Sequence, residues 1–311
     1  RWKHCWRARQ PANALGPPAA SPAFSSTLQT AAWLKHRVPA RAPAVQDVCY
    51  PQEMIFDFTD VIVRTPAPSV VDGLRAIDIG APRYDGVLAE HAAYVQALRD
   101  AGVAVETLPP LPAFPDSVFV EDAALAFHEG AIVLRPGAPS RRGEAAEIAP
   151  VLSRRFERVL KLSEGAVDGG DVLATPRGVL IGQSERTTAE GARALIALLA
   201  ELGLTGRAVA TPRGVLHFKS DCSLLDEETI LATSTLAASG VFDGFRVVLT
   251  PAGEEGAANA VRVNDVVLMS GVFPRTRDML DQLGFALVSL ATREIAKIDA
   301  GLSCMSLRWR A

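Results

Sequence analysis

Four stretches of the chain repeat one arrangement, in which a strand, a tight turn and a second strand follow one another. The strand pairs are expected at 122–127 with 131–135, 171–174 with 178–182, 222–225 with 229–233, and 260–263 with 266–270. Their turns are rich in Gly, Pro, Asp and Asn, which are typical of hairpins. At least three pairs are followed by a helical pattern and another strand, at 143–156 and 159–160, 188–202 and 208–209, and 275–283 and 286–288.

A fifth unit of the same kind is expected at 60–108. It has a strand at 60–64, helical spacing of apolar residues at 90–101 and a strand at 103–108, but no obvious hairpin partner for its first strand. Units of roughly 40 to 60 residues arrange themselves around an axis. The sequence therefore predicts an α/β fold, a five-bladed α/β propeller of repeated ββαβ units, with loops from several units meeting at its centre.

The first part of the chain differs in composition from the rest. No Asp or Glu occurs from Arg1 to Gln46, and Met54 is the first methionine. Three interpretations compete, namely a disordered extension, an organelle-type presequence and upstream sequence foreign to the mature protein. We expect 1–53 to be a disordered or non-native extension and 54–311 to be a single catalytic α/β-propeller domain.

Charge and cysteine content bound the possible partners. The 311 residues carry a net charge of −3, which gives no reason to expect nucleic acid or an anionic membrane as partner. The four cysteines have no spacing typical of a metal site or a disulfide framework, and no apolar run is long enough to span a bilayer. We expect a cytoplasmic, reducing location, a small-molecule substrate, and a monomer or homodimer.

Cys304 follows a helix-like segment (292–300) and precedes a strand-like one (305–309). A thiol held at such a junction can face a cleft, as the nucleophile of a cysteine enzyme must. The alternative is that Cys304 is one more buried small residue. His217 is the histidine best placed for a general acid or base, although a histidine in an apolar run is often structural. The run Asp168-Gly-Gly-Asp171 brings carboxylates to a tight turn, or is an ordinary Asp-Gly turn.

Acidic and basic clusters indicate what the centre could bind. Asp116 and Asp122, with Phe119 above them, would form an anionic pocket for a cationic group. Arg141 and Arg186 could hold a carboxylate by paired hydrogen bonds. Together these clusters fit an amino acid with a cationic side chain, whereas each cluster alone could be a solvated surface.

Five motifs occur in one order, namely PDSVFVED, RPGAPSRR, VDGGDVL, LHFKSDCS and IDAGLSC. With them the sequence resembles the dimethylarginine dimethylaminohydrolase family of the pentein superfamily, from about Asp60 to Trp309. The resemblance implies Cys304 as nucleophile, His217 as general acid/base and Asp168 as the carboxylate that orients the histidine. It implies substrate binding by Asp116, Phe119, Glu121, Asp122, Arg141, Arg186 and Ile298, and a mobile lid within 65–80.

The family's reaction turns N(omega)-methylated arginines into citrulline and an amine through a covalent thiouronium on the cysteine, without metal or organic cofactor. Arginine deiminases are the nearest alternative, but they generally carry an Asp where this chain has Lys219, and an Arg before the Asp that corresponds to Asp122. An alternative of another class is a non-catalytic propeller protein, since a fold does not define a function. Retention of Cys304, His217 and Asp168 together favours the enzyme.

Overall fold

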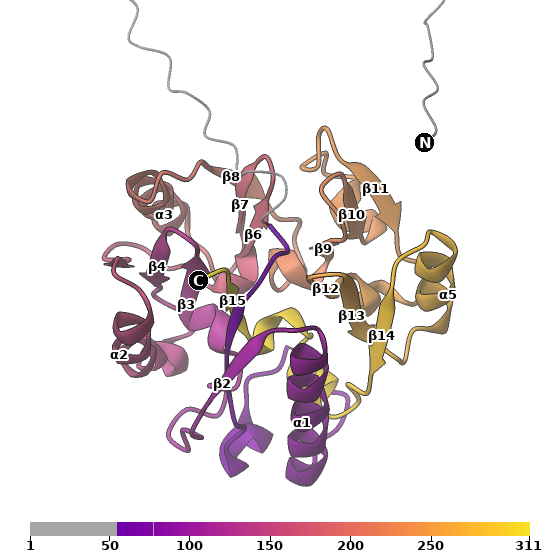
Figure 1. The fold of residues 1–311 in the computed structure, drawn as a ribbon, viewed down its shortest axis with the longest axis horizontal. Coiled ribbons are helices and arrows are strands. Elements are labelled where there is room, and N and C mark those ends of the chain that lie inside the picture. The colour runs from indigo at the N-terminus through magenta and orange to yellow at the C-terminus, as the bar shows by residue number, and fades with distance from the viewer. Residues whose placement is uncertain (1–54, 77) are drawn as a thin grey trace, which may run out of the picture. The chain divides into compact units, whose positions relative to one another are not determined.

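The computed structural model describes residues 55–76 and 78–311, which belong to one compact unit. The extension expected at 1–53 lies outside the described residues. Within the described unit, five three-stranded sheets surround a common centre, and the longer helices lie at the periphery (Figure 1). The sequence prediction of a five-bladed α/β propeller is confirmed.

Every sheet has the same internal order. Its middle strand pairs antiparallel with an inner strand and parallel with an outer strand. From inner to outer, the sheets are β15 (Leu307–Trp309), β1 (Asp60–Arg64) and β2 (Ala104–Leu108); β3 (Ala124–Phe127), β4 (Gly130–Val133) and β5 (Val159–Lys161); β6 (Val172–Thr175), β7 (Gly178–Gln183) and β8 (Gly206–Ala210); β9 (Cys222–Leu224), β10 (Thr229–Ala232) and β11 (Arg246–Leu249); and β12 (Val261–Val263), β13 (Val266–Ser270) and β14 (Leu287–Leu290).

A helix connects the middle strand to the outer strand in each unit, as a parallel pair requires. The helices are α1 (Tyr84–Asp100), α2 (Glu144–Arg155), α3 (Ala189–Glu201), α4 (Ser234–Ala237) and α5 (Pro274–Gln282). Helix α1 starts six residues before the segment expected from apolar spacing. The added first turn contains Gly86, which interrupts the apolar spacing. A glycine is needed there, because a Cβ at this position would lie 2.5 Å from Cγ of Glu294.

The first strand finds its missing partner at the far end of the chain. β1 pairs antiparallel with β15, with Asp60 opposite Trp309 and Ile62 opposite Leu307. The last inner strand is therefore added to the first sheet, which closes the ring of sheets. This arrangement also carries Cys304, which lies just before β15, to the centre of the unit.

The prediction of a helix at 292–300 is wrong. Only a single 3-10 turn forms, at Ile295–Ile298, and Asp299 then adopts a left-handed conformation with φ of 55°. A left-handed residue cannot continue a helix. The chain therefore turns sharply before Cys304 and enters a second 3-10 turn, Ser303–Met305.

Apolar side chains fill the spaces between sheets and helices. Val87, Tyr94 and Leu98 of α1 are fully buried against the first sheet, and Leu195 and Leu199 of α3 are fully buried against the third. These packed layers fix the sheets, and with them the loops at the axis. No helix in the described ranges is long and apolar enough to cross a membrane.

Candidate active site

Each of the five inner strands is preceded by a 3-10 turn near the axis. These turns are Val120–Ala123, Gly169–Asp171, Phe218–Ser220, Glu255–Ala258 and Ser303–Met305. Asp122 and Cys304 lie on the first and last of them. Asp168 and His217 are the residues immediately before the second and third, and Asn259 immediately follows the fourth. Residues far apart in sequence are thus brought together because equivalent positions of a propeller converge.

A pocket of about 430 Å³, counted to its mouth in solvent, lies among these turns. All the site residues named from the sequence, except Glu121, contribute to its lining. They are Asp116, Phe119, Asp122, Arg141, Asp168, Arg186, His217, Ile298 and Cys304. Leu74, Leu216, Asp299 and Ala300 also line it, and sequence reasoning had assigned none of these four a role.

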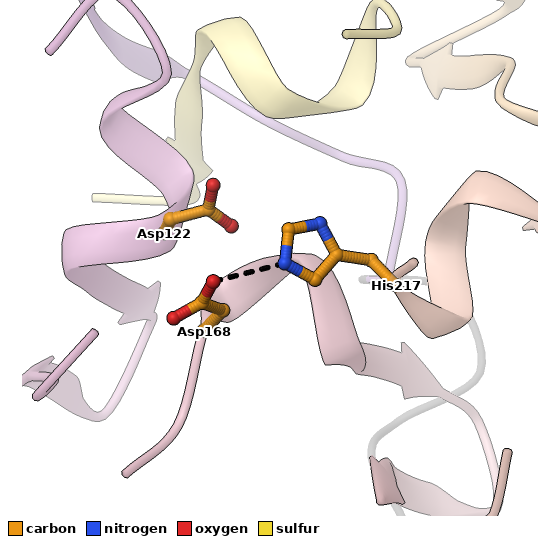
Figure 2. Close-up of side chains that lie close together, drawn as sticks. All are labelled: Asp122, Asp168 and His217. Atoms are coloured by element: carbon orange, nitrogen blue, oxygen red, sulfur yellow. Dashed lines mark hydrogen bonds and ion pairs between the residues drawn. The ribbon is translucent and has the colours of Figure 1, made fainter. Parts of the chain in front are cut away.

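His217 is held by Asp168 within the pocket. Nε2 of the imidazole lies 2.9 Å from Oδ2 of Asp168, and the carboxylate of Asp122 points toward the same ring (Figure 2). The second carboxylate oxygen of Asp168 accepts a hydrogen bond of 2.7 Å from the backbone N–H of Gly137. Asp168 therefore fixes the orientation of the ring and leaves Nδ1 as the nitrogen available for proton transfer.

The charge of His217 is set by its surroundings. Burial lowers the pKa of His217, but the carboxylates of Asp122, Asp168 and Asp171 outweigh burial and raise that pKa to about 9. The imidazole is therefore protonated at neutral pH. A protonated imidazole can act as a general acid toward a departing amine.

Cys304 is buried, and the thiol form is favoured in the empty pocket. Burial together with the carboxylates of Asp122 and Glu121 raises the pKa of Cys304 to about 11, although the backbone N–H of Gly301 and the charge of Lys219 act in the opposite direction. A cation placed beside the sulfur would favour the thiolate. The other cysteine within the described ranges, Cys222, is fully buried and donates to the carbonyl of Phe218, and burial raises its pKa well above the ordinary value.

Arg141 clamps the acidic wall of the pocket. Its guanidinium bonds Oδ2 of Asp122 and both carboxylate oxygens of Glu144, at 3.0 and 2.7 Å, and its Nη2 also donates to two backbone carbonyls. Oδ1 of Asp122 accepts from the backbone N–H of Gly170 at 2.8 Å. Most donors of Arg141 are thus already used, and the position of Asp122 is fixed from two sides.

Arg186 and Asp116 are more open to a ligand. Arg186 is half-buried, and its guanidinium has no hydrogen-bond or ion-pair partner among the residues that the structure describes. Asp116 accepts one hydrogen bond of 2.9 Å, from the backbone N–H of Leu74 in the expected lid segment. Burial raises the pKa of Asp116, while Arg141 and Arg186 counteract it. A cation and an anion therefore both face the pocket.

Glu121 points to a different part of the molecule. Its Oε1 pairs with Nζ of Lys219 and, at 2.9 Å, with Nη2 of Arg308. These three residues line a second cavity of about 1100 Å³, also counted to its mouth in solvent, whose remaining walls come mainly from the inner strands. The family resemblance implies that Glu121 binds substrate beside Asp122, but a 3-10 turn directs the two neighbours to different sides.

The paired glycines of the 168–171 motif allow the turns to approach one another. A Cβ on Gly169 would lie 1.9 Å from the carbonyl oxygen of Glu121, and one on Gly170 would lie 2.8 Å from the ring of His217. Asp171 accepts from the backbone N–H of Phe218 at 2.8 Å and so holds the turn that carries the histidine. The motif is therefore a close contact between turns as well as the source of a carboxylate.

Ligand atoms of Asp122, Asp168 and His217 lie within 4.8 Å of one another, which is compact enough for a metal ion. These groups are already engaged, however, since Asp168 bonds His217 and Asp122 bonds Arg141. A metal ion would have to displace these bonds. The arrangement is better suited to proton transfer beside a thiol than to metal binding.

A five-sheet propeller with cysteine, histidine and carboxylates on its axis places the chain in the pentein superfamily. Residues 83–211 match the family model described as N,N dimethylarginine dimethylhydrolase, eukaryotic. The chain is 41% identical over 254 residues to the N(G),N(G)-dimethylarginine dimethylaminohydrolase of Pseudomonas aeruginosa, covering 81% of this chain and 100% of that protein. The chain belongs to the dimethylarginine dimethylaminohydrolase family.

Two further comparisons agree. The N(G),N(G)-dimethylarginine dimethylaminohydrolase of Streptomyces coelicolor is 34% identical over 255 residues, which cover 80% of this chain and 96% of that protein. The solved structure of a Cys-to-Ser mutant of the Pseudomonas aeruginosa enzyme with citrulline superimposes with a TM-score of 0.79, covering 81% of this chain and all of that one. The resemblance seen in the five motifs is therefore confirmed.

Proposed function

We propose that this protein hydrolyses N(omega)-methylated arginines, such as asymmetric dimethylarginine and monomethylarginine, to citrulline and the corresponding methylated amine. The observation that carries the proposal is the single pocket into which Cys304, His217, Asp168 and Asp122 all project. Family membership and the citrulline bound to the Pseudomonas aeruginosa relative support it. The reaction class is hydrolysis of a C–N bond of a linear amidine.

The ends of the substrate fit the charges of the pocket. The guanidinium lies against Asp122, which Arg141 and the Gly170 N–H hold in place, with Phe119 at its face. The α-amino group pairs with Asp116 and the α-carboxylate with Arg186, with Arg141 contributing the donor capacity that its internal bonds leave. Ile298 contributes a main-chain contact. Glu121 supports this wall from behind, through Lys219 and Arg308.

The chemistry proceeds in two steps. The substrate cation favours loss of the Cys304 proton to solvent, and the thiolate adds to the guanidinium carbon. His217, protonated in the resting state, donates its Nδ1 proton to the substituted nitrogen, so that the amine leaves as a neutral molecule and a thiouronium remains on Cys304. The neutral imidazole then takes a proton from water, and the hydroxide adds to the same carbon. The C–S bond of the adduct breaks, the proton of the new hydroxyl returns to the sulfur, and citrulline is released.

The charges around the pocket favour methylated substrates over arginine. Lys219, which replaces the Asp expected in a deiminase, pairs with Glu121 and does not line the pocket. The guanidinium thus has one carboxylate fewer near its distal nitrogens, which leaves apolar space for N-methyl groups. A thiol nucleophile also suits a reducing compartment such as the cytoplasm, and we propose that the protein acts there as a monomer or homodimer.

The test is product analysis with purified protein. Asymmetric dimethylarginine should yield citrulline and dimethylamine in equal amounts, and arginine should yield little citrulline. The Cys304→Ser variant is the control and should bind the methylated substrate without turnover. Citrulline and ammonia from arginine at comparable rates would make the protein a deiminase, and turnover by Cys304→Ser would exclude the covalent route.

A further inference from the structure

Asn259 directly follows the one axial 3-10 turn of the described sheets that supplies no group to the proposed reaction. Four of the five 3-10 turns supply a group to the proposed reaction, namely Asp122, Asp168, His217 and Cys304. The remaining turn, Glu255–Ala258, is followed directly by Asn259, a residue that is 8% exposed. Its sheet is the one adjoining, in chain order, the sheet that carries Cys304.

The amide of Asn259 contacts the nucleophile segment at two points. Oδ1 accepts a hydrogen bond of 3.2 Å from the backbone N–H of Ser303, and Nδ2 lies 3.9 Å from Sγ of Cys304. The orientation of the amide follows from chemistry, because a backbone N–H can only donate and therefore requires the amide oxygen. The NH2 group must then face the sulfur.

Gly301 shows how closely Asn259 is fitted. A Cβ at Gly301 would lie 2.1 Å from Cγ, 2.3 Å from Nδ2 and 2.4 Å from Oδ1 of Asn259. The φ of Gly301 is not in the left-handed region, so close packing of the amide, rather than backbone conformation, excludes a side chain there. The turn before Cys304 therefore packs directly against the amide of Asn259.

The sulfur needs a donor of this kind. The charges of Asp122 and Glu121 oppose the Cys304 thiolate, whereas the charge of Lys219 and the Gly301 N–H favour it. Protonated His217 lines the same pocket. Asn259 adds a neutral N–H donor that stabilises a thiolate without binding a proton itself.

We propose that Asn259 is a positioning residue for the nucleophile, which fixes the Ser303–Cys304 backbone through Oδ1 and donates Nδ2–H to the Cys304 thiolate. This inference deepens the proposed function, since it rests on Cys304 being the nucleophile. Its effect is on the reactivity of the sulfur, which can be measured without any substrate.

The decisive variant is Asn259→Asp, which keeps an oxygen for the Ser303 N–H and replaces the donor toward sulfur by an acceptor. The rate of iodoacetamide alkylation at Cys304, followed by peptide mass spectrometry at pH 7, should fall at least about tenfold, since one pKa unit changes the thiolate fraction tenfold. Asn264→Asp is the matched control, because Asn264 bridges Phe58 and Ala101 by the same two amide atoms and does not line the pocket. The alkylation rate of the control should remain within twofold of wild type.

A second pair of variants separates positioning from folding. Gly301→Ala should displace the amide and lower the alkylation rate, whereas the same change in an Asn259→Ala background should have little further effect, so that the two changes are not additive. A normal alkylation rate in folded Asn259→Asp, or additive effects of the pair, would overturn the proposal. Turnover by Cys304→Ser would instead refute the proposed function, while the alkylation result would still decide whether Asn259 controls the sulfur.

Discussion

Glu121 and Asp122 are consecutive residues whose carboxylates serve opposite sides of one 3-10 turn. Asp122 enters the pocket that Cys304 and His217 line and is held there by Arg141 and the Gly170 N–H. Glu121 turns to the axial cavity and pairs with Lys219 and Arg308. One turn therefore supplies a carboxylate to the pocket and an ionic support beneath it.

Glu121→Gln should affect stability more than substrate affinity. The change leaves Lys219 and Arg308, both largely buried, without their shared carboxylate, and the loss of one partner of a buried pair costs about 3 kcal/mol. Urea unfolding should show this loss, while KM for dimethylarginine changes little. Asp122→Asn is the contrasting variant and should lower kcat/KM strongly. A large rise in KM for a fully stable Glu121→Gln protein would assign Glu121 to the substrate.

Arg186 and Arg141 should respond differently to removal. Arg186→Ala should raise KM by about 10- to 100-fold, as expected for loss of a charge-assisted hydrogen bond, with little change in the free energy of unfolding. Arg141→Met should lower the free energy of unfolding by several kcal/mol, because the buried carboxylates of Asp122 and Glu144 lose their cationic partner. Steady-state kinetics and urea unfolding of both variants test the division. Equal stability losses would contradict it.

Asp168→Asn should shift the alkaline limit of activity. Asp168 is one of the carboxylates that raise the pKa of His217 to about 9, so the variant should lose protonated imidazole at a lower pH. The pH profile of kcat measures this shift. Asp168→Glu keeps the charge and should remain more active than Asp168→Asn at every pH. An unchanged pH profile in Asp168→Asn would show that a group other than His217 controls the loss of activity at alkaline pH.

His217 should make the folded protein less stable as the pH rises. Its pKa is raised from 6.5 to about 9, so the folded state binds the proton more tightly than the unfolded state does. This stabilisation, of about 3 kcal/mol, is fully present below pH 6.5 and is lost as the pH rises through 9. Urea unfolding between pH 6 and 10 should show the decline, and His217→Gln should show less of it. The same slope in both proteins would contradict the assignment.

The two cysteines of the propeller should differ under the same substitution. Cys304→Ser should reduce turnover below detection and retain binding, because the weaker nucleophile keeps the shape of the pocket. Cys222→Ser should remain active, since the hydroxyl can still donate to the Phe218 carbonyl and residue 222 does not line the pocket. Isothermal titration and product assays on both variants give the comparison, and inactivity of a folded Cys222→Ser protein would show an unexpected role for that residue.

Local sequence patterns predicted the repeated units well. Hairpin turns such as 128–130 and 176–178 and the apolar spacing of α3 depend on interactions within a few residues, so they are visible in the sequence. The helical pattern at 292–300 gave a wrong prediction, because long-range contacts decide the conformation of this segment. Glu294 and Ile295 near its start donate to Glu90, and Ser303 just beyond its end donates to Asn259. Both acceptors are distant in sequence, and the chain follows those contacts instead of its local preference.

By itself the sequence determined five strand–helix units and the residue types of a cysteine hydrolase, because periodicity and ordered motifs are local properties. Only the tertiary structure decided that β15 completes the first sheet, that Glu121 leaves the pocket which Asp122 enters, and that Asn259 meets Cys304. These relations join residues up to two hundred and fifty positions apart. They arise because closure of a ring brings equivalent turns to one axis, and no local pattern encodes which side chains then face one another.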